Sequence, residues 1–193
     1  LIFPRYHQLN VIRKLKNQVR FDGIGNSYLI QHTTGSGKSF EIGWLSHLLT
    51  SLYQSDTDTK RMFDTIIVIT DRKVLDKQLQ NTIKSLEQTS GVVKPVDESS
   101  EQLKKYLESG KDIIITTIQK FPFIANAISS LGDKKFGVII DEVHSSQTGE
   151  RSKDLKKALS KYDLTEGDYE DYLRAEINSR GQQSHISFFG FTG

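Results

Sequence analysis

The residues with the clearest chemical potential are the run Gly-Ser-Gly-Lys-Ser at 35–39. It follows a strand-like run at 27–31 and precedes helix-like apolar spacing at 40–52. Such a loop can hold a triphosphate, because its backbone N–H groups converge on the β-phosphate and the helix N-terminus adds a positive field. Lys38 can reach the β- and γ-phosphates, and the Ser39 hydroxyl can ligate Mg²⁺.

His32 departs from the strict phosphate-loop pattern, which has a glycine five residues before Gly37. The inner Gly-Ser-Gly still gives the backbone the freedom to wrap a phosphate. The alternative is a Ser/Gly turn that merely joins a strand to a helix. We favour the phosphate loop, since a lysine and a serine directly after such a turn have no packing purpose.

A second chemical feature is the carboxylate pair Asp141 and Glu142, which ends the apolar run 138–142. Ligands bind at the carboxyl ends of strands in open α/β sheets, so Asp141 can hold Mg²⁺ beside Ser39. Glu142 can then polarise the water that attacks the γ-phosphate. Acidic pairs at strand ends are common, but together with a phosphate loop this pair favours ATP hydrolysis.

The five histidines are considered for a role in the site, and only His144 has a candidate one. His144 is either a satisfied polar group in a loop or a bridge from the ATP site to Thr192, where it would sense hydrolysis. The remaining four are scattered, and no metal-ligand spacing is present, so a histidine metal centre is not expected: His7, His32, His47 and His185.

Upstream of the loop, Arg5, Tyr6 and Gln8 form a cluster that can read a base. An aromatic ring can stack on adenine, and a glutamine amide can both donate to it and accept from it. The helix-like run that follows to Arg20 has one apolar face, with Val11, Ile12, Leu15 and Val19. Its basic residues are interpreted as solvated.

Apolar strands alternate with helical segments along the chain, which predicts a doubly wound, mainly parallel α/β sheet. Nearly continuous β-branched runs are typical of strands buried on both faces. Five strands are expected, at 27–31, 64–70, 111–117, 136–142 and 184–190. Helices are expected in the run that follows Gln8 and extends to Arg20, at 40–52, from 71 onward, at 101–108 and at 152–162, with a polar loop over 91–100.

The amino-acid composition limits the classes of function and the locations that are expected for the chain. The chain has 193 residues, 26 Lys and Arg against 24 Asp and Glu, and a net charge of +2, which is too balanced to diagnose nucleic-acid binding by itself. It has no cysteine, which excludes disulfides and thiolate sites and fits a cytoplasmic location. No apolar run approaches the roughly 20 residues of a membrane helix, so no membrane association is expected.

The motifs taken in order resemble those of superfamily 2 helicases, and within them the motor (restriction) subunit of type I restriction–modification enzymes. The matching stretches are 5–8 (the adenine-reading glutamine motif), 31–39 (motif I, with His32 in the form these subunits favour), 70–78 (motif Ia), 116–121, 141–147 (motif II) and 190–193 (motif III). Val143 stands where alanine is usual. Ser145 replaces an arginine, which puts that arginine's contact in doubt.

This resemblance implies a RecA-like, three-layer α/β/α phosphate-loop NTPase over residues 1–193, using ATP and Mg²⁺ as the first motor domain of a longer chain. Both ends are interpreted as cuts. The implied ATP contacts are Arg5, Tyr6, Gln8, Thr33, Thr34, Gly35, Ser36, Gly37, Lys38 and Ser39, with Lys38, Asp141 and Glu142 catalytic, Ser39 and Asp141 on the metal, and His144, Thr192 and Gly193 coupling.

The same resemblance implies partners and an activity for the whole protein. It would join methylation and specificity subunits and pump double-stranded DNA before a separate nuclease domain cuts it. DNA phosphates would meet Arg72, Gln78, Thr117 and Gln119. For Arg72 and Gln78, the alternative is simple helix capping and solvation. The acidic insertion at 149–183, between motifs II and III, is either a solvated excursion or a docking surface.

Three other functions stay open from the residues alone. The chain could belong to another superfamily 2 DNA or RNA helicase, which the neighbouring sequence would reveal. It could be a nucleotide-switched interaction module, which would not need Glu142. A small-molecule kinase fits less well, because the acidic pair and His144 suit water activation rather than a second substrate.

Overall fold

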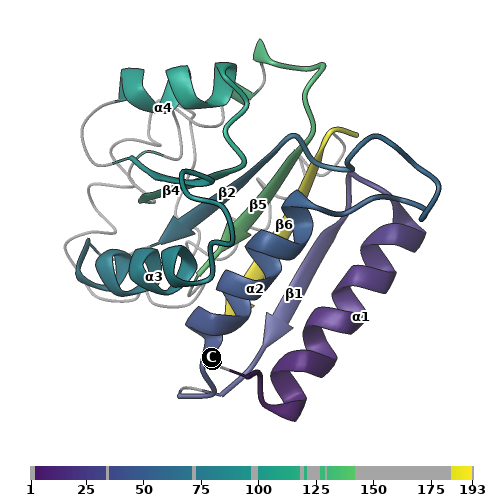
Figure 1. The fold of residues 1–193 in the computed structure, drawn as a ribbon, viewed down its shortest axis with the longest axis vertical. Coiled ribbons are helices and arrows are strands. Elements are labelled where there is room, and N and C mark those ends of the chain that lie inside the picture. The colour runs from purple at the N-terminus through teal and green to yellow at the C-terminus, as the bar shows by residue number, and fades with distance from the viewer. Residues whose placement is uncertain are drawn as a thin grey trace, which may run out of the picture.

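The fold is taken from a computed structural model that describes residues 3–33, 35–70, 73–96, 100–117, 120, 127–128, 130–141 and 184–192. Its elements in chain order are α1 (Tyr6–Asp22), β1 (Ser27–Gln31), α2 (Lys38–Thr50), β2 (Thr65–Thr70), α3 (Lys73–Ser85), β3 (Val93–Pro95), α4 (Ser100–Glu108), β4 (Ile113–Thr117), β5 (Phe136–Ile140) and β6 (Ile186–Thr192). Strands and helices thus alternate through most of the described chain (Figure 1).

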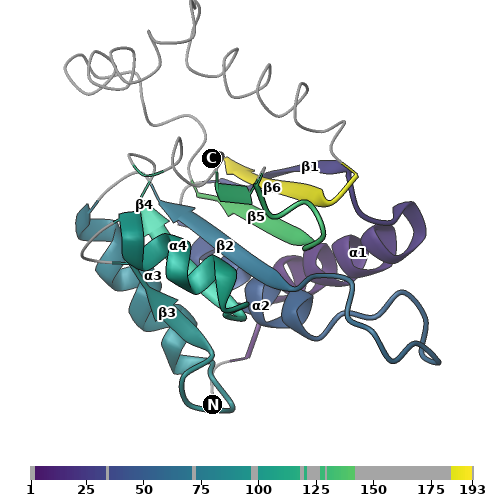
Figure 2. The ribbon, with the colours of Figure 1, turned by 90° about the horizontal axis from the view of Figure 1, so that it is seen from above.

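The six described strands form one sheet in the order β1-β6-β5-β2-β4-β3, and every described pair is parallel. β1 and β3 therefore lie at opposite edges of the sheet (Figure 2). Because the strands are parallel, all their carboxyl ends meet at one edge, where α/β proteins bind ligands. The predicted parallel α/β sheet is confirmed.

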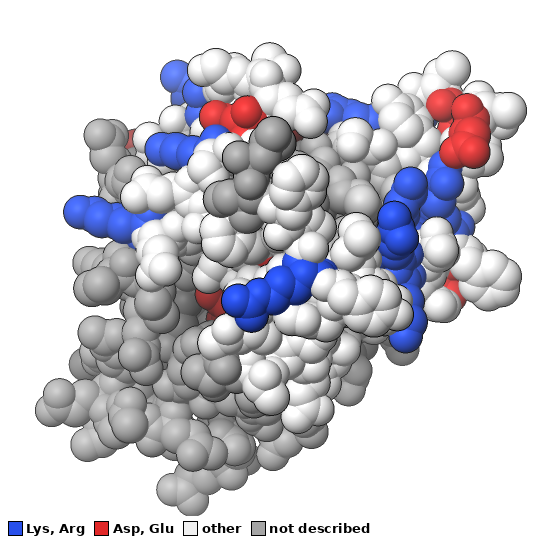
Figure 3. Space-filling model, turned by 60° about the horizontal axis from the view of Figure 1, so that its bottom comes forward, with Lys and Arg blue, Asp and Glu red and all other residues white. Residues whose placement is uncertain are grey.

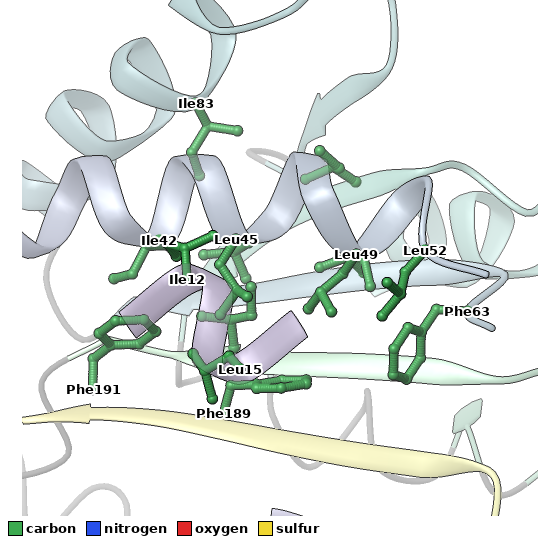
Figure 4. Close-up of a cluster of buried hydrophobic side chains, with 14 of the residues drawn as sticks. Ile12, Leu15, Ile42, Leu45, Leu49, Leu52, Phe63, Ile83, Phe189 and Phe191 are labelled. Carbon is green, nitrogen blue, oxygen red and sulfur yellow. The ribbon is translucent and has the colours of Figure 1, made fainter. Parts of the chain in front are cut away.

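Helices cover both faces of the sheet. On one face, buried side chains of α1, α2 and α3 pack against residues such as Ile66, Val68 and Phe189. Figure 4 shows the side chains of α1 and α2 gathered over the phenylalanines of β6. On the other face, α4 packs Leu103 and Leu107 against alternate residues of β2, β4, β5 and β6. Successive side chains of each strand point to opposite faces of the sheet, so each strand contributes alternate residues to two hydrophobic cores.

The predicted loop over 91–100 is wrong in part, because Val93–Pro95 forms the edge strand β3. Val93 is buried and lies opposite Ile113 of β4. A proline is tolerated there since an edge strand can leave one side of its backbone unpaired. The last strand also ends two residues later than predicted, with Phe191 and Thr192 buried inside β6.

Some predictions fall on residues that the structure does not describe. The predicted helix at 152–162 and the acidic insertion at 149–183 lie outside the described residues. Within the described part, every helix is too short or too polar to traverse a lipid bilayer.

Candidate nucleotide site

The phosphate loop lies between β1 and α2, at the carboxyl edge of the sheet. Gly35 and Gly37 both have positive φ, of 80° and 89°, which L side chains rarely adopt. Gly37 is the N-cap of α2, and no side chain caps it among the described residues. The first N–H groups of this helix are therefore available to an anion, as a phosphate site requires.

Lys38 and Ser39 open α2. The Lys38 ammonium donates to the main-chain oxygen of His32 at 3.3 Å, so the lysine folds back over the loop. The partly buried Ser39 is the next residue of the helix. The loop is shaped further by a hydrogen bond from the Ser36 amide to the Thr33 oxygen at 3.1 Å, whereas Thr34 lies outside the described residues.

Helix α1 holds the loop from the side. The Gln8 amide nitrogen donates to the oxygens of Ser36 at 3.0 Å and Gly37 at 3.3 Å, and its oxygen accepts from the Arg5 amide at 2.8 Å. Gln8 is buried, whereas Arg5 and Tyr6 are exposed. The sequence predicted an adenine contact for all three, which stays a prediction. The contact between Gln8 and the loop was not foreseen.

Gly37 is required by this contact as well as by its φ. A Cβ atom added at Gly37 would lie 2.5 Å from the Gln8 amide nitrogen, a distance that real Cβ atoms do not show. A side chain at position 37 would therefore require the Gln8 amide to move, which would disturb its hydrogen bonds to the Ser36 and Gly37 oxygens.

Sequence reasoning missed a buried carboxylate beneath the loop. Glu41, in the first turn of α2, is fully buried, and both its oxygens lie within hydrogen-bond distance of His32 Nδ1, at 2.8 and 2.9 Å. His7 adds a second contact, with Nε2 3.2 Å from the Ser36 oxygen and its ring edge-on to that of His32. An acidic residue inside the apolar run 40–49 was the signal available in the sequence.

The second half of the predicted site lies on the neighbouring strands. β1, β6 and β5 are adjacent, so the loop, Thr192 and Asp141 share one edge of the sheet. The His32 amide donates to the Thr192 oxygen at 3.0 Å, and the Asp141 amide donates to the Ile69 oxygen at 3.0 Å. Glu142, His144 and Gly193 lie outside the described residues.

Unsatisfied polar atoms are present at this edge. Within the described part of the chain, the buried hydroxyls of Ser36 and Thr192 have no hydrogen-bond partner. The described residues include no cluster of three or more His, Cys, Asp or Glu side chains that could hold a metal. In nucleotide sites Mg²⁺ is usually held by one or two protein ligands together with phosphate oxygens and water, so such a cluster is not needed for it.

Two of the four predicted DNA contacts fall on residues that the structure describes. Gln78 is exposed on α3, and Thr117 is buried at the end of β4, opposite Thr70 of β2. Arg72 and Gln119 lie outside the described residues. In the view with the bottom of Figure 1 brought forward, Lys and Arg side chains stand in several separate places (Figure 3). All four DNA contacts stay predictions.

Comparison with known proteins fixes the family. A family model described as SWI2/SNF2 ATPase matches residues 7–165. The chain belongs to the SWI2/SNF2 ATPase family. This match covers the phosphate loop, strand β5 and Asp141 directly after it, so the ATPase assignment and the geometry of the site agree.

Relatives of this SWI2/SNF2 family member are subunits of restriction enzymes. The type I restriction enzyme SauMSSORF170P endonuclease subunit of Staphylococcus aureus is 31% identical over 161 residues, which cover 81% of this chain. The putative type I restriction enzyme MjaVIIIP endonuclease subunit of Methanocaldococcus jannaschii is 27% identical over 188 residues, covering 82%. The chain spans only 16% and 18% of the length of these relatives.

Solved structures support the fold. The Pyrococcus furiosus Hef helicase domain matches 98% of this chain and 32% of its own, with a TM-score of 0.58 at 17% identity. A nuclease-deletion mutant of the type ISP restriction-modification enzyme LlaGI, in complex with a DNA substrate mimic, matches 98% of this chain and 17% of its own, with a TM-score of 0.60 at 12% identity. The predicted RecA-like fold is confirmed.

Proposed function

We propose that residues 1–193 form the first motor domain of a type I restriction enzyme subunit, which couples ATP hydrolysis to movement along double-stranded DNA. Cleavage would belong to a separate domain of the longer protein, and methylation and specificity subunits would be its partners. The observation that carries the ATPase part is the uncapped start of α2 behind a Gly-Ser-Gly loop, with Lys38 folded over it.

The residues present fit Mg²⁺ and a triphosphate. The positive φ of Gly35 and Gly37 leaves room for a phosphate against the backbone, and the unpartnered Ser36 hydroxyl is one more donor for an incoming oxygen. Ser39 and Asp141 would hold the metal. When bound, Mg²⁺ neutralises charge that develops on the phosphate oxygens.

The residues of the proposed site would then have distinct roles. Lys38 would leave the His32 oxygen and donate to the β- and γ-phosphates, which places a positive charge where negative charge develops in the transition state. Glu142 would accept a hydrogen bond from the attacking water and align it with the γ-phosphorus. Tyr6, 84% exposed at the start of α1, is free to stack on the adenine ring.

The DNA part of the proposal depends on the relatives and on the predicted contacts after β2 and β4. Arg72, Gln78, Thr117 and Gln119 would touch the phosphate backbone, which positions a motor without reading sequence. Thr192, on β6 beside β1, would report the state of the phosphate loop through the His32 amide, with His144 as its partner.

The test is the ATPase rate of the full-length protein with its partner subunits, with and without double-stranded DNA that carries their site. DNA should stimulate the wild type, and Lys38→Ala should reduce the stimulated rate by about 100-fold or more, since a positioned charge is lost. Lys104→Ala, on the exposed side of α4, is the matched control and should retain the rate.

Two outcomes would redirect the proposal. An ATPase rate that DNA does not stimulate, or that Lys38→Ala does not reduce, would contradict a DNA motor driven by this loop. Unchanged DNA-stimulated turnover in Glu142→Gln would favour a nucleotide-switched interaction module, which has no need of a catalytic carboxylate.

A further inference from the structure

His32 is the residue that breaks the strict phosphate-loop pattern, and the structure gives it a specific partner. Its Nδ1 lies 2.8 and 2.9 Å from the two carboxylate oxygens of Glu41. A carboxylate only accepts hydrogen bonds, so Nδ1 is assigned as the protonated nitrogen that donates. The ring is thereby fixed in one orientation against the first turn of α2.

The main chain of the same residue contacts two other parts of the site. The His32 oxygen accepts from the Lys38 ammonium at 3.3 Å, and the His32 amide donates to the Thr192 oxygen at 3.0 Å. One residue therefore joins α2, the catalytic lysine and the end of β6. Fixing its ring also fixes the carbonyl on which Lys38 rests.

Glu41 makes this arrangement obligatory. Its side chain is fully buried, and its carboxylate pairs with His32. A buried carboxylate that loses its partner is strongly unfavourable, which ties Glu41 to the histidine. The positive end of the α2 dipole also favours a carboxylate in the first turn.

The far half of the loop is held independently. Gln8 donates to the Ser36 and Gly37 oxygens, and His7 contacts the Ser36 oxygen and the edge of the His32 ring. The loop is thus braced by α1 at its second half and by the His32–Glu41 pair at its first half. A glycine at 32 would supply no such brace.

We propose that His32 and Glu41 are positioning residues of the ATP site. Their hydrogen-bonded pair holds the start of the phosphate loop and the resting place of Lys38 in the geometry that accepts a triphosphate. Neither residue needs to touch the nucleotide. This inference rests on the proposed function of the loop as an ATP site.

The test is binding of Mg-ATP to the full-length protein, measured by calorimetry beside the melting temperature of each variant. His32→Ala should weaken Mg-ATP binding about tenfold, because a displaced loop misaligns its donors. His32→Asn, which keeps an N–H near the place of Nδ1, should stay within about twofold of the wild type. A loss in His32→Asn equal to that in His32→Ala would overturn the hydrogen bond as the cause.

A double variant separates positioning from stability. His32→Leu with Glu41→Leu removes both partners together, which should largely restore the melting temperature that either single change lowers. Mg-ATP binding should nevertheless remain at least about fivefold weaker, because the carbonyl of residue 32 then lacks the constraint that the side-chain hydrogen bond supplied. Recovery of both properties would overturn the proposal and leave the pair a purely structural contact.

Lys38→Ala distinguishes a failure of the proposed ATP site from a failure of the positioning role of His32 and Glu41. If Lys38→Ala binds Mg-ATP normally, the proposed ATP site itself fails, and this inference fails with it. If Lys38→Ala loses binding while His32→Ala keeps it, only the positioning role of His32 and Glu41 is overturned.

Discussion

At the scale of single residues, the phosphate loop is defined by backbone shape as much as by side chains. Gly35 has a φ of 80°, and a Cβ atom added there would meet nothing within 4 Å. Its replacement therefore tests backbone strain alone. Gly23, after the end of α1, offers the same φ within two degrees and the same open surroundings, away from the loop.

We expect Gly35→Ala and Gly23→Ala each to lower the free energy of unfolding by about 1 kcal/mol or more, because both force an L residue to a positive φ that L side chains rarely adopt. Only Gly35→Ala should also weaken Mg-ATP binding, since its N–H belongs to the proposed phosphate cradle. Urea unfolding and calorimetric titration of both variants provide the measurement. Equal nucleotide binding by the two would argue against this cradle.

Tyr28 on β1 gives the chain a distinctive response to high pH. Its hydroxyl donates to the Asp22 carboxylate at 3.1 Å, and burial, this hydrogen bond and the negative charge of Asp22 raise the Tyr28 pKa well above 10.0. The unfolded chain releases this proton more readily than the folded one. The stabilisation is therefore complete below about pH 10 and is lost as pH rises through the folded pKa.

The expected result is that wild type loses stability relative to Tyr28→Phe as pH rises above about 10, as measured by urea unfolding at about pH 8 and about pH 11. Phenylalanine retains the stacking on Phe189, whose ring centroid lies 5.2 Å away. Tyr53→Phe is the control, since Arg20 engages its main-chain oxygen. Parallel pH profiles for wild type and Tyr28→Phe would contradict the argument.

At the scale of elements, α2 connects the site to the core. It begins at Lys38 and Ser39 and continues through Ile42, Leu45 and Leu49, which are all fully buried among side chains of α1 and the sheet (Figure 4). The helix that presents Lys38 is thus anchored by fully buried side chains along its length. A packing defect in α2 should therefore lower the free energy of unfolding first.

Leu45→Ala should cost about 2–5 kcal/mol of unfolding free energy, the range for a leucine removed from a well-packed core. Leu29→Ala on β1 is the matched control, because Leu29 is 66% exposed and should change stability by no more than about 0.5 kcal/mol. Denaturant midpoints of both variants check this. A small effect of Leu45→Ala would mean that the core repacks around α2.

The elements that sequence predicted best are those with a strong local signal. Continuous β-branched runs such as 65–70 and 113–117 read as buried strands because parallel strands bury both faces. β3 gave a weaker signal, since three residues with a lysine and a proline read as loop until β4 is in place to pair with them. Edge pairing is decided by the neighbour, which the local sequence does not reveal.

At the scale of the whole molecule, the parts of the site that could be predicted are those with a local sequence signal. The parts that could not be predicted are contacts between elements. The loop, Lys38 and Asp141 follow from motifs and from the rule that parallel strands end at one edge. The contact of Gln8 with Ser36, 28 positions apart, depends on how α1 packs beside the loop. The contact of His32 with Glu41, nine positions apart, depends on how the loop turns from β1 into α2.

The proposed motor predicts a measurable electrostatic contribution from one position on the DNA side. Arg72→Gln should flatten the slope of log affinity against log salt by about one unit if Arg72 meets a phosphate, because one fewer counterion is released. Lys104→Gln on α4 should leave the slope unchanged. Binding of the full-length protein to double-stranded DNA over a salt series is the measurement, and equal slopes for both variants would contradict the contact.

The pairing of β1 with β6 also has a consequence during synthesis on the ribosome. Ser27 lies opposite Phe188, and β6 is the strand neighbour of β1 among the described residues, so the strand that leads into the phosphate loop waits for a partner made roughly 160 residues later. At about 5–20 residues per second, this delay is on the order of 10–30 s. A nascent chain therefore carries its complete motif I long before it can bind a nucleotide.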